Sequence, residues 1–437
     1  MVFYYILMLS LGFQHLSLLS YHLFGFTVEK YLGLLCLIYA LFYLLGRKTP
    51  VRLWASWQAC AFSCFFVLAA VSWLTMSLQR FQGSMLLVYL SESVFLVSTL
   101  IMVDSVKRLR WVLLTALAGM AWASLYSIRE WEKALPVYGF SYRPKWGPEG
   151  DPNYLAAAAV LCLPIAYYLF ISSKRRFDRL FVLACALPIV GALLVGASRG
   201  GLLALVVACA VVLFQSRRKR AKFIVLGGVL AVLFMVSPVS PVRRLLHPTA
   251  IGIGSENDRL ELWNAGLRMI EDHPLTGIGL GNFRAEVPAY LLPGERIDFI
   301  AHNTYIEVAA TMGIPGLLLF VWILTATFRS LVRTHRRAKE SDSVLIYTAA
   351  SGLIAGLAGY CVAMTFLSTE YIKVFWFGIF LSAAIEPLAR AKQPRQTGEE
   401  IVCPEAEPVL ATDTESLLPS EWAPTRRPDW WSEEGRV

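Results

Sequence analysis

Charged side chains are scarce in this chain of 437 residues: they make up 16% of it, while hydrophobic residues make up 57%. This balance excludes most water-soluble globular folds and indicates a protein with many membrane spans. The eight cysteines lack the paired spacing of a metal site or a disulfide framework, so they are expected to be small core residues. The N-terminus lacks the basic region and cleavage site of a signal peptide, so its apolar start is expected to be a first helix.

Apolar runs follow one another along most of the chain, and each membrane crossing needs about 17–25 such residues. Twelve candidate spans result, near residues 3–25, 31–46, 53–75, 84–103, 110–128, 154–172, 180–197, 201–215, 222–238, 313–331, 344–367 and 372–389. Clusters of Lys and Arg occupy every second short connection, and the positive-inside rule assigns these to the cytoplasm. We therefore expect an all-α polytopic integral membrane protein of about twelve transmembrane helices, with both termini cytoplasmic.

The composition changes near residue 390. Residues 1–390 are expected to form one transmembrane domain, with a large periplasmic loop at 239–302 that contains short helices. Residues 391–437 are rich in Pro and Glu and are expected to form a disordered cytoplasmic tail. No internal repeat is visible.

Arg199 interrupts an apolar stretch, 180–214, that is too long for one crossing. Its neighbours Ser198, Gly200 and Gly201 favour a tight reversal between two membrane helices. A charge at such a position is costly and suggests a functional site. The alternative is an interfacial arginine that reaches out to lipid phosphate.

Two other outer segments carry polar residues at expected helix starts. Asp151 followed by Pro152 fits a helix cap, whereas Asn153 has no such structural explanation. In residues 258–272, helical periodicity puts Arg259 on the apolar side, together with Leu260, Leu262, Trp263, Leu267 and Ile270. A charge on a packing face needs a buried acid or an anionic ligand, so a structural ion pair and a ligand site both remain open.

His302 precedes another helix start, because Thr304-x-x-Glu307 fits a capping box. Backbone N–H groups gather at such a point, which favours a nearby anion and disfavours a protonated imidazole. This helix is expected to end at Met312-Gly313, before the next span opens. A hydrogen-bonded structural histidine is the alternative interpretation.

Four motifs thus share the outer side of the membrane: Asp151-Pro152-Asn153, Ala197-Ser198-Arg199-Gly200-Gly201, Arg259-x-x-x-Trp263 leading to 274–283, and 302–307 through 313–316. In order, spacing and location they resemble the O-antigen ligase and polymerase family of bacterial envelope glycosyltransferases, mainly over residues 150–330. The resemblance implies an enzyme of the bacterial inner membrane. It would transfer a glycan from an undecaprenyl-diphosphate carrier to an acceptor on the periplasmic face, such as lipid A-core.

The resemblance also implies roles for individual residues. Arg199, Arg259 and His302 match the family's catalytic arginine and histidine positions. Substrate binding is expected from Asp151, Asn153, Ser198, Gly200, Asn303 and Tyr305. Two arginines can grip diphosphate oxygens, so no metal or cofactor is expected. A neutral His302 can act as the base in an inverting displacement, and the glycines are expected to let the head group approach the backbone.

Several alternatives remain open at this point. A metal-dependent mechanism would use Glu256 and Asp258, although Asp258 is better explained as a helix cap. A polysaccharide or lipid transporter would often show two related halves, which are not visible. Lipopolysaccharide ligase, O-antigen or exopolysaccharide polymerase and protein O-oligosaccharyltransferase differ in acceptor, and the sequence does not decide among them. Membrane lipids are expected partners, and nucleic acid is not.

Overall fold

The computed structural model describes residues 1–13, 22–23, 26–46, 56–77, 83–139, 142–144, 146, 151–215, 227–228, 255–291 and 300–391. The chain divides into two units, Met1–Gln393 and Pro394–Val437, and every described residue belongs to the first. All but the first residue of the predicted tail at 391–437 lies outside the described residues, so its disorder stays a prediction.

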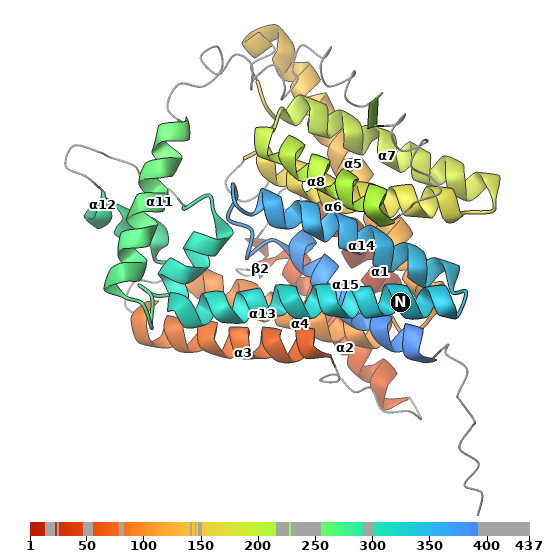
Figure 1. Cartoon of the computed structure of the whole chain (residues 1–437), viewed down its shortest axis with the longest axis horizontal. Coiled ribbons are helices and arrows are strands. Elements are labelled where there is room, and N and C mark those ends of the chain that lie inside the picture. Colours follow the sequence, from red (N-terminus) through yellow and green to blue (C-terminus); the bar gives the residue numbers. More distant parts are fainter. Residues whose placement is uncertain are drawn as a thin grey trace, which may run out of the picture. The chain divides into compact units, whose positions relative to one another are not determined.

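Helices make up nearly all of the described chain, and the predicted all-α class is confirmed (Figure 1). The long helices are α2 (Val28–Leu45), α3 (Trp57–Ser72), α4 (Gly83–Met102), α5 (Val106–Tyr138), α6 (Asn153–Ser172), α7 (Arg176–Gly196), α8 (Arg199–Gln215), α11 (Ser255–Asp272), α13 (Thr304–Glu340), α14 (Val344–Ala363) and α15 (Lys373–Ala391). The short ones are α1 (Val2–Ser10), η1 (Leu11–Phe13), η2 (Trp73–Ser77) and α12 (Phe283–Tyr290). Two short strands, β1 (His22–Leu23) and β2 (Phe26–Thr27), pair antiparallel.

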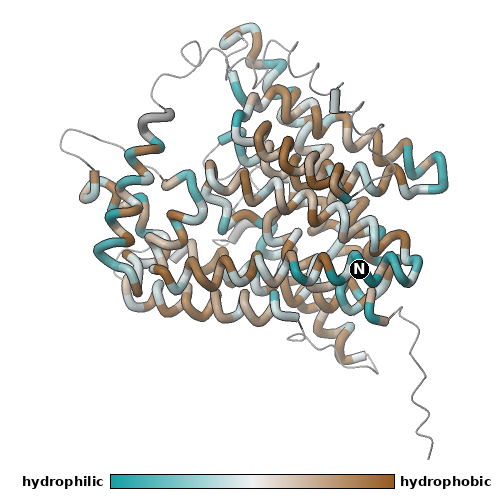
Figure 2. The backbone as a smooth tube through the Cα atoms, viewed as in Figure 1, coloured by the Kyte–Doolittle hydropathy of each residue, from teal (hydrophilic) through white to brown (hydrophobic). Residues whose placement is uncertain are grey.

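Nine helices of the described chain are long and apolar enough to cross a membrane: α2 to α7, with α3 extended to Met76, and α13 to α15. The polytopic character is therefore confirmed. Helix α8 is apolar but has only 17 residues. Of the predicted first span, 3–25, the structure describes 3–13 and 22–23, and residues 22–23 form strand β1, so the predicted helix does not reach residue 25. The predicted span at 222–238 lies outside the described residues apart from 227–228. Figure 2 shows hydrophobic stretches along these helices and hydrophilic stretches at several helix ends and connections.

Small residues explain how the membrane helices approach one another. Helix α14 packs against α6 and α8. A Cβ added at Gly356 would lie 2.4 Å from the Leu161 carbonyl oxygen of α6, and one at Gly359 would lie 2.6 Å from that of Ala204 in α8. Inside a bilayer, helix association depends on such close packing because the lipid is as apolar as the side chains. Helix α14 thereby fixes the positions of α6 and α8, whose first residues carry much of the candidate site.

A separate small core joins α11 and α12 to the start of α13. Its buried members are Leu262, Met269, Phe283, Val287, Ala301 and Ala310. The prediction that Leu260 and Leu267 share the packing face of α11 is wrong, because these side chains are 55% and 48% exposed. The buried face is centred on Leu262, Ala265 and Met269, and Arg259 precedes it by one turn.

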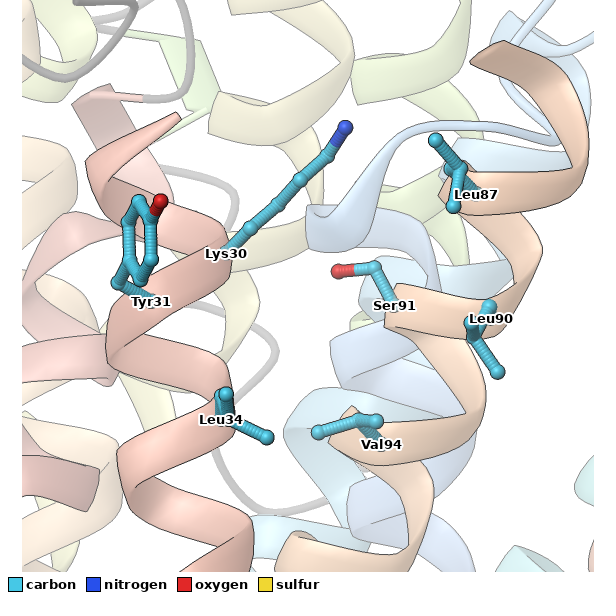
Figure 3. Close-up of a pocket in the computed structure, with 7 residues that line it drawn as sticks. All are labelled: Lys30, Tyr31, Leu34, Leu87, Leu90, Ser91 and Val94. Atoms are coloured by element: carbon cyan, nitrogen blue, oxygen red, sulfur yellow. The ribbon is translucent and has the colours of Figure 1, made fainter. Parts of the chain in front are cut away.

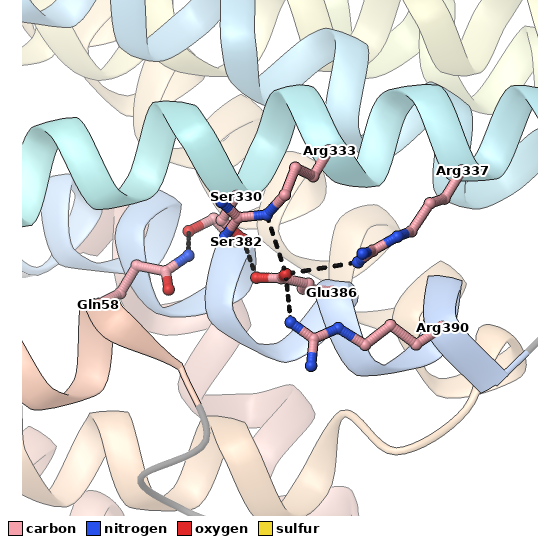
Figure 4. A network of polar contacts seen from close by, with 7 residues as sticks. All are labelled: Gln58, Ser330, Arg333, Arg337, Ser382, Glu386 and Arg390. Atoms are coloured by element: carbon pink, nitrogen blue, oxygen red, sulfur yellow. Dashed lines mark hydrogen bonds and ion pairs between the residues drawn. The ribbon is translucent and has the colours of Figure 1, made fainter.

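An ion cluster holds α13 to α15 at the end remote from His302 (Figure 4). The buried Glu386 carboxylate pairs with Arg390 at 2.7 Å, Arg333 at 3.4 Å and Arg337 at 3.6 Å. Ser330 donates a further hydrogen bond to the same carboxylate. This concentration of arginine lies about 44 Å along α13 from its first residue, at a rise of 1.5 Å per residue.

Candidate active site

Helix α13 breaks at Gly313, as predicted. Gly313 has φ 69° and ψ −177°, a conformation that is nearly restricted to glycine. The segment after α11 fills the break: Ile314 N–H donates to the Pro274 carbonyl at 2.8 Å, and Ile278 N–H donates to the Ala310 carbonyl at 2.9 Å. A Cβ at Gly277 would lie 2.4 Å from the Thr311 backbone. The glycine-rich motif at 274–283 therefore anchors the α11 region to the first turns of α13.

His302 lies immediately before this helix and is only 8% exposed. Its backbone is left-handed, with φ 49°, a conformation in which His is enriched among non-glycine residues. Burial, together with the Arg259 guanidinium, lowers the pKa of His302 from the ordinary 6.5 to about 4, while the Asp151 carboxylate acts in the opposite sense. His302 is consequently neutral at pH 7, and Arg259 and Asp151 are both near enough to influence it.

The helix start itself differs from the predicted capping box. Asn303 is the cap, because its Oδ1 accepts from Tyr305 N–H at 3.0 Å and Ile306 N–H at 3.2 Å. The predicted cap Thr304 turns away and donates its hydroxyl to the Leu367 carbonyl at 2.7 Å. The prediction failed because a tertiary partner, the connection between α14 and α15, engages Thr304. The cap gives Asn303 a structural role, while its predicted contact with substrate stays a prediction.

Glu307 also turns to the connection between α14 and α15 instead of back to the helix start. Ser368 donates a hydrogen bond to its carboxylate. Glu370 in the same connection is 6% exposed, and burial, together with the Glu307 carboxylate, raises its pKa well above the usual range. The sequence predicted Glu307 only as the capping partner of Thr304, and Glu370 was not singled out, since nothing in their spacing links 307 to 368–370.

Arg259 is half-buried on the first turns of α11. One turn later, Trp263 donates its indole Nε1–H to the Ala301 carbonyl at 3.0 Å. A Cβ on Gly266 would lie 2.4 Å from Ile306 of α13, so the two helices touch at this point. The Arg259-x-x-x-Trp263 motif therefore joins the helix that carries Arg259 to the residue that precedes His302.

Asp151 and Asn153 meet at the start of α6. Asp151 Oδ1 accepts from the Asn153 N–H at 2.9 Å, but the cap residue of α6 is Pro152, so the predicted cap at Asp151 with Pro152 as the first helical residue is wrong by one position. Asn153 Nδ2 donates to Asp151 Oδ2 at 3.0 Å. Asn153 thus has a structural explanation that the sequence did not reveal.

Arg143 completes this arrangement and was not predicted. It donates from Nη2 to Asn153 Oδ1 at 2.8 Å and from Nε to the Gly196 carbonyl at 2.7 Å. The second bond satisfies a carbonyl at the end of α7, which the helix itself leaves open. Arg143 therefore ties the α6 start to the turn that carries Arg199. Its position among mixed charges in an outer loop gave no periodic signal.

The predicted reversal before Arg199 is present. Helix α7 ends at Gly196, Ala197 is left-handed with φ 42°, and Arg199 is the first residue of α8. Ser198 is buried and caps α8, because its Oγ accepts from the Gly201 N–H at 3.0 Å. The half-buried Arg199 side chain leaves from a helix start whose backbone N–H groups favour anions.

The two glycines after Arg199 have a packing reason that was not expected. A Cβ at Gly200 would lie 3.2 Å from the Phe366 ring, and one at Gly201 would lie 2.6 Å from the Ala156 Cβ. The close approach at these positions is therefore to protein, which explains both residues without a ligand. Contact between Gly200 and a head group stays a prediction.

Tyr305 also takes a structural position. Its hydroxyl donates to the Cys361 carbonyl at 3.0 Å, and its ring packs edge-on against Phe320, 6.3 Å away between centroids. The side chain thus joins α13 to α14, and its predicted contact with substrate stays a prediction.

Among the described residues, no group of three or more His, Cys, Asp or Glu could hold a metal ion.

Comparison with known proteins gives two matches, both partial. Residues 183–321 match a family described as O-antigen ligase, which confirms the resemblance over that segment. The "Exopolysaccharide production protein ExoQ" of Rhizobium meliloti (strain 1021) is 26% identical over 133 residues, which is 28% of this chain and 28% of that protein. The family match includes Arg199, Arg259 and His302, while Asp151, Asn153 and Arg143 lie before it.

Proposed function

We propose that this protein transfers a glycan from a lipid diphosphate carrier, of the undecaprenyl-diphosphate type, to an acceptor hydroxyl. One observation carries the proposal: the Trp263–Ala301 hydrogen bond joins the helix of Arg259 to the buried His302, whose pKa responds to the charges of Arg259 and Asp151. A buried neutral imidazole beside a guanidinium combines a proton acceptor with a group that binds phosphate. The match of residues 183–321 to the O-antigen ligase family supports this reaction class.

In the proposed reaction the acceptor oxygen attacks the anomeric carbon of the donor. The new carbon–oxygen bond forms as the bond to the diphosphate breaks, and the diphosphate leaves with the bonding electrons. Nitrogen of His302 takes the hydroxyl proton, and Arg199 and Arg259 stabilise the negative charge on the departing oxygens. A single displacement inverts the anomeric centre. No step requires a metal ion, because the two arginines supply the positive charge.

The low pKa of His302 fits this reaction once the donor is considered. Burial and, to a smaller extent, the Arg259 guanidinium lower the pKa of His302 to about 4, which makes the imidazole a weak base. A bound diphosphate would offset the Arg259 charge and raise the pKa of His302 toward neutrality, where proton transfer is more effective. The base would therefore strengthen when the donor is in place.

The proposed location is the bacterial inner membrane, with the site on the periplasmic face and both termini in the cytoplasm. Support comes from α13, which has His302 before its first residue and Arg333 and Arg337 in its last turns. The positive-inside rule favours the arginine-rich end as cytoplasmic. His302 would then face the other side, where glycan acceptors are found.

Two acceptors follow from two observations. The family match favours ligation to lipid A-core or a similar acceptor. The name of the Rhizobium relative, an exopolysaccharide production protein, favours polymerisation onto another carrier-linked glycan.

The purified protein should be given a carrier-linked oligosaccharide with lipid A-core, and in parallel without it. Transfer to lipid A-core supports the ligase, and chain growth in its absence supports the polymerase. Failure of both reactions would contradict the proposal.

A further inference from the structure

A groove lies between α2 and α4, two helices that carry none of the candidate catalytic residues (Figure 3). It is lined by Lys30, Tyr31, Leu34, Leu87, Leu90, Ser91 and Val94. Leu34 is 50% exposed and Leu90 is 49% exposed, so large apolar side chains remain uncovered along it. Its volume of about 230 Å³ is below the range of about 300–1,000 Å³ usual for drug-sized ligands, which suits part of a single hydrocarbon chain.

One end of the groove is polar. The half-buried Lys30 side chain extends from α2 toward α4, above Leu34 and Val94 (Figure 3). Beside it, Glu29 pairs with Lys373 of α15 at 3.2 Å, and these two lysines and one glutamate together carry one net positive charge. Ser91 adds a hydroxyl to the wall, whereas the next residue, Glu92, is fully buried and does not line the groove.

The polar end is also the end at which the candidate site is built. Lys30 and Glu29 belong to the first turn of α2, and Lys373 begins α15. The connection before α15 reaches the start of α13, where Thr369 N–H donates to the Thr304 hydroxyl at 2.9 Å. Lys30 therefore lies toward the leaflet that faces the candidate active site.

We propose that this groove binds an anionic phospholipid of that leaflet, with one acyl chain against Leu34, Leu87 and Leu90 and the phosphate beside Lys30. Charge complementarity selects the head group, because a lysine ammonium binds phosphate as a point charge. The apolar wall accepts the chain, and a second chain stays in the bilayer. Phospholipids are the abundant phosphate-bearing molecules at this depth, and the groove does not depend on the proposed transferase activity.

A bound lipid would bridge α2 and α4, and through the Glu29–Lys373 pair it would also stabilise the start of α15. A ligand that binds only the folded state raises stability by RT ln(1 + [L]/Kd). Lipid binding should therefore raise the unfolding temperature of the protein in a manner that depends on Lys30.

The test uses the full chain in detergent, with phosphatidylglycerol or phosphatidylethanolamine added and retained lipids counted by native mass spectrometry. Lys30→Gln should reduce retained phosphatidylglycerol at least tenfold and phosphatidylethanolamine much less, because the ammonium of that head group already neutralises its phosphate, while Leu90→Trp should reduce both by filling the groove. Lys107→Gln on α5 and Leu203→Trp on α8, where Leu203 is 48% exposed, are the matched controls and should bind as the wild type does. A photoreactive residue at Leu34 should crosslink to phosphatidylglycerol in vesicles.

Three results would overturn the proposal. One is unchanged retention of phosphatidylglycerol by Lys30→Gln. Another is absence of a lipid crosslink from Leu34 when the same photoreactive residue at Leu203 of α8 gives as much or more. The third is displacement of phosphatidylglycerol by an equimolar polyprenyl phosphate, which would assign the groove to the carrier lipid. Misfolding of Lys30→Gln or Leu90→Trp could lower lipid retention by itself. The crosslink from Leu34 does not depend on either variant, so it tests lipid binding separately.

Discussion

The indole Nε1 of Trp263 donates to the backbone carbonyl of Ala301 at 3.0 Å, and this bond joins the helix of Arg259 to the residue before His302. The two catalytic candidates are 43 positions apart in the sequence, so their relative placement depends on contacts of this kind. Neither Arg259 nor Trp263 alone indicates a functional site, but the spacing of about one helical turn places them on the same side of α11.

Trp263→Phe should keep the ring and remove the hydrogen bond. A lost hydrogen bond of this kind costs about 0.5–1.5 kcal/mol, and the freed movement of α11 should reduce glycan transfer about tenfold. Turnover by purified protein and its unfolding temperature are the measurements. Trp111→Phe on α5, whose side chain is half exposed, is the control and should change neither. Equal turnover by Trp263→Phe and the wild type would show that this hydrogen bond does not position α11 for transfer.

The pKa of His302 should respond in opposite directions to two substitutions. Arg259 lowers this pKa, so Arg259→Met should raise it from about 4, although burial should keep it below 6.5. Asp151 raises it, so Asp151→Asn should lower it further. Titration by NMR of isotope-labelled histidine, with His302→Gln to assign the signal, measures the value. A His302 pKa that neither substitution changes would contradict the nearness of Arg259 and Asp151 to His302.

Asn303 can be tested for capping separately from substrate binding. Asn303→Ala removes the acceptor for the N–H groups of Tyr305 and Ile306 and should cost about 1 kcal/mol of stability. Asn303→Asp keeps an acceptor oxygen and should keep stability. If Asn303 only caps, Asn303→Asp should also keep most transfer activity. A folded but inactive Asn303→Asp protein would favour the predicted substrate contact instead.

The glycine after Gly200 can be tested by a compensating pair. Gly201→Ala brings a Cβ to 2.6 Å from the Ala156 Cβ and should lower the unfolding temperature and the yield of inserted protein. Ala156→Gly in the same chain should restore most of both losses, since it removes the nearest contact and leaves the Ser198 side chain, 3.1 Å from the added carbon. Gly33→Ala on α2, with no atom within 4 Å of the added carbon, should be harmless. Failure of the second substitution to rescue would show that packing is not the reason for this glycine.

Much of the fold could be predicted because it depends on local signals. Long apolar runs predicted the spans, the Ser198–Gly201 sequence predicted the reversal before α8, and Gly313 predicted the break in α13. The resemblance assigned Arg199, Arg259 and His302 to one site; the Arg259 charge does act on His302, while the place of Arg199 beside them stays a prediction. Each of these inferences uses residues close in the sequence or a motif order.

The failures share a different cause, which is contact between distant segments. Thr304 is recruited by the Leu367 carbonyl, and this leaves the cap to Asn303. Arg143 acquires its role from the Gly196 carbonyl, 53 positions away. Gly200 faces Phe366, which no local pattern could indicate. Polar residues at helix starts were therefore correctly found, while the partners that decide their roles required the folded chain.

The central claim is that Arg199, Arg259 and His302 act together in glycan transfer. The most direct measurement is the rate of transfer from a carrier-linked oligosaccharide by purified Arg199→Ala, Arg259→Ala and His302→Ala proteins, treated with a chelator throughout. Arg329→Ala is the matched control, an exposed arginine on α13 far from His302. We expect the transfer rate of each of the three variants to fall at least 100-fold while the protein remains folded and inserted. The rates of the control and of the chelated wild type should not change. Transfer within about threefold of wild type by all three variants would show that these residues do not act together in the reaction. Loss of transfer by the wild-type protein on chelation, and its return with a divalent ion, would contradict the metal-independent mechanism.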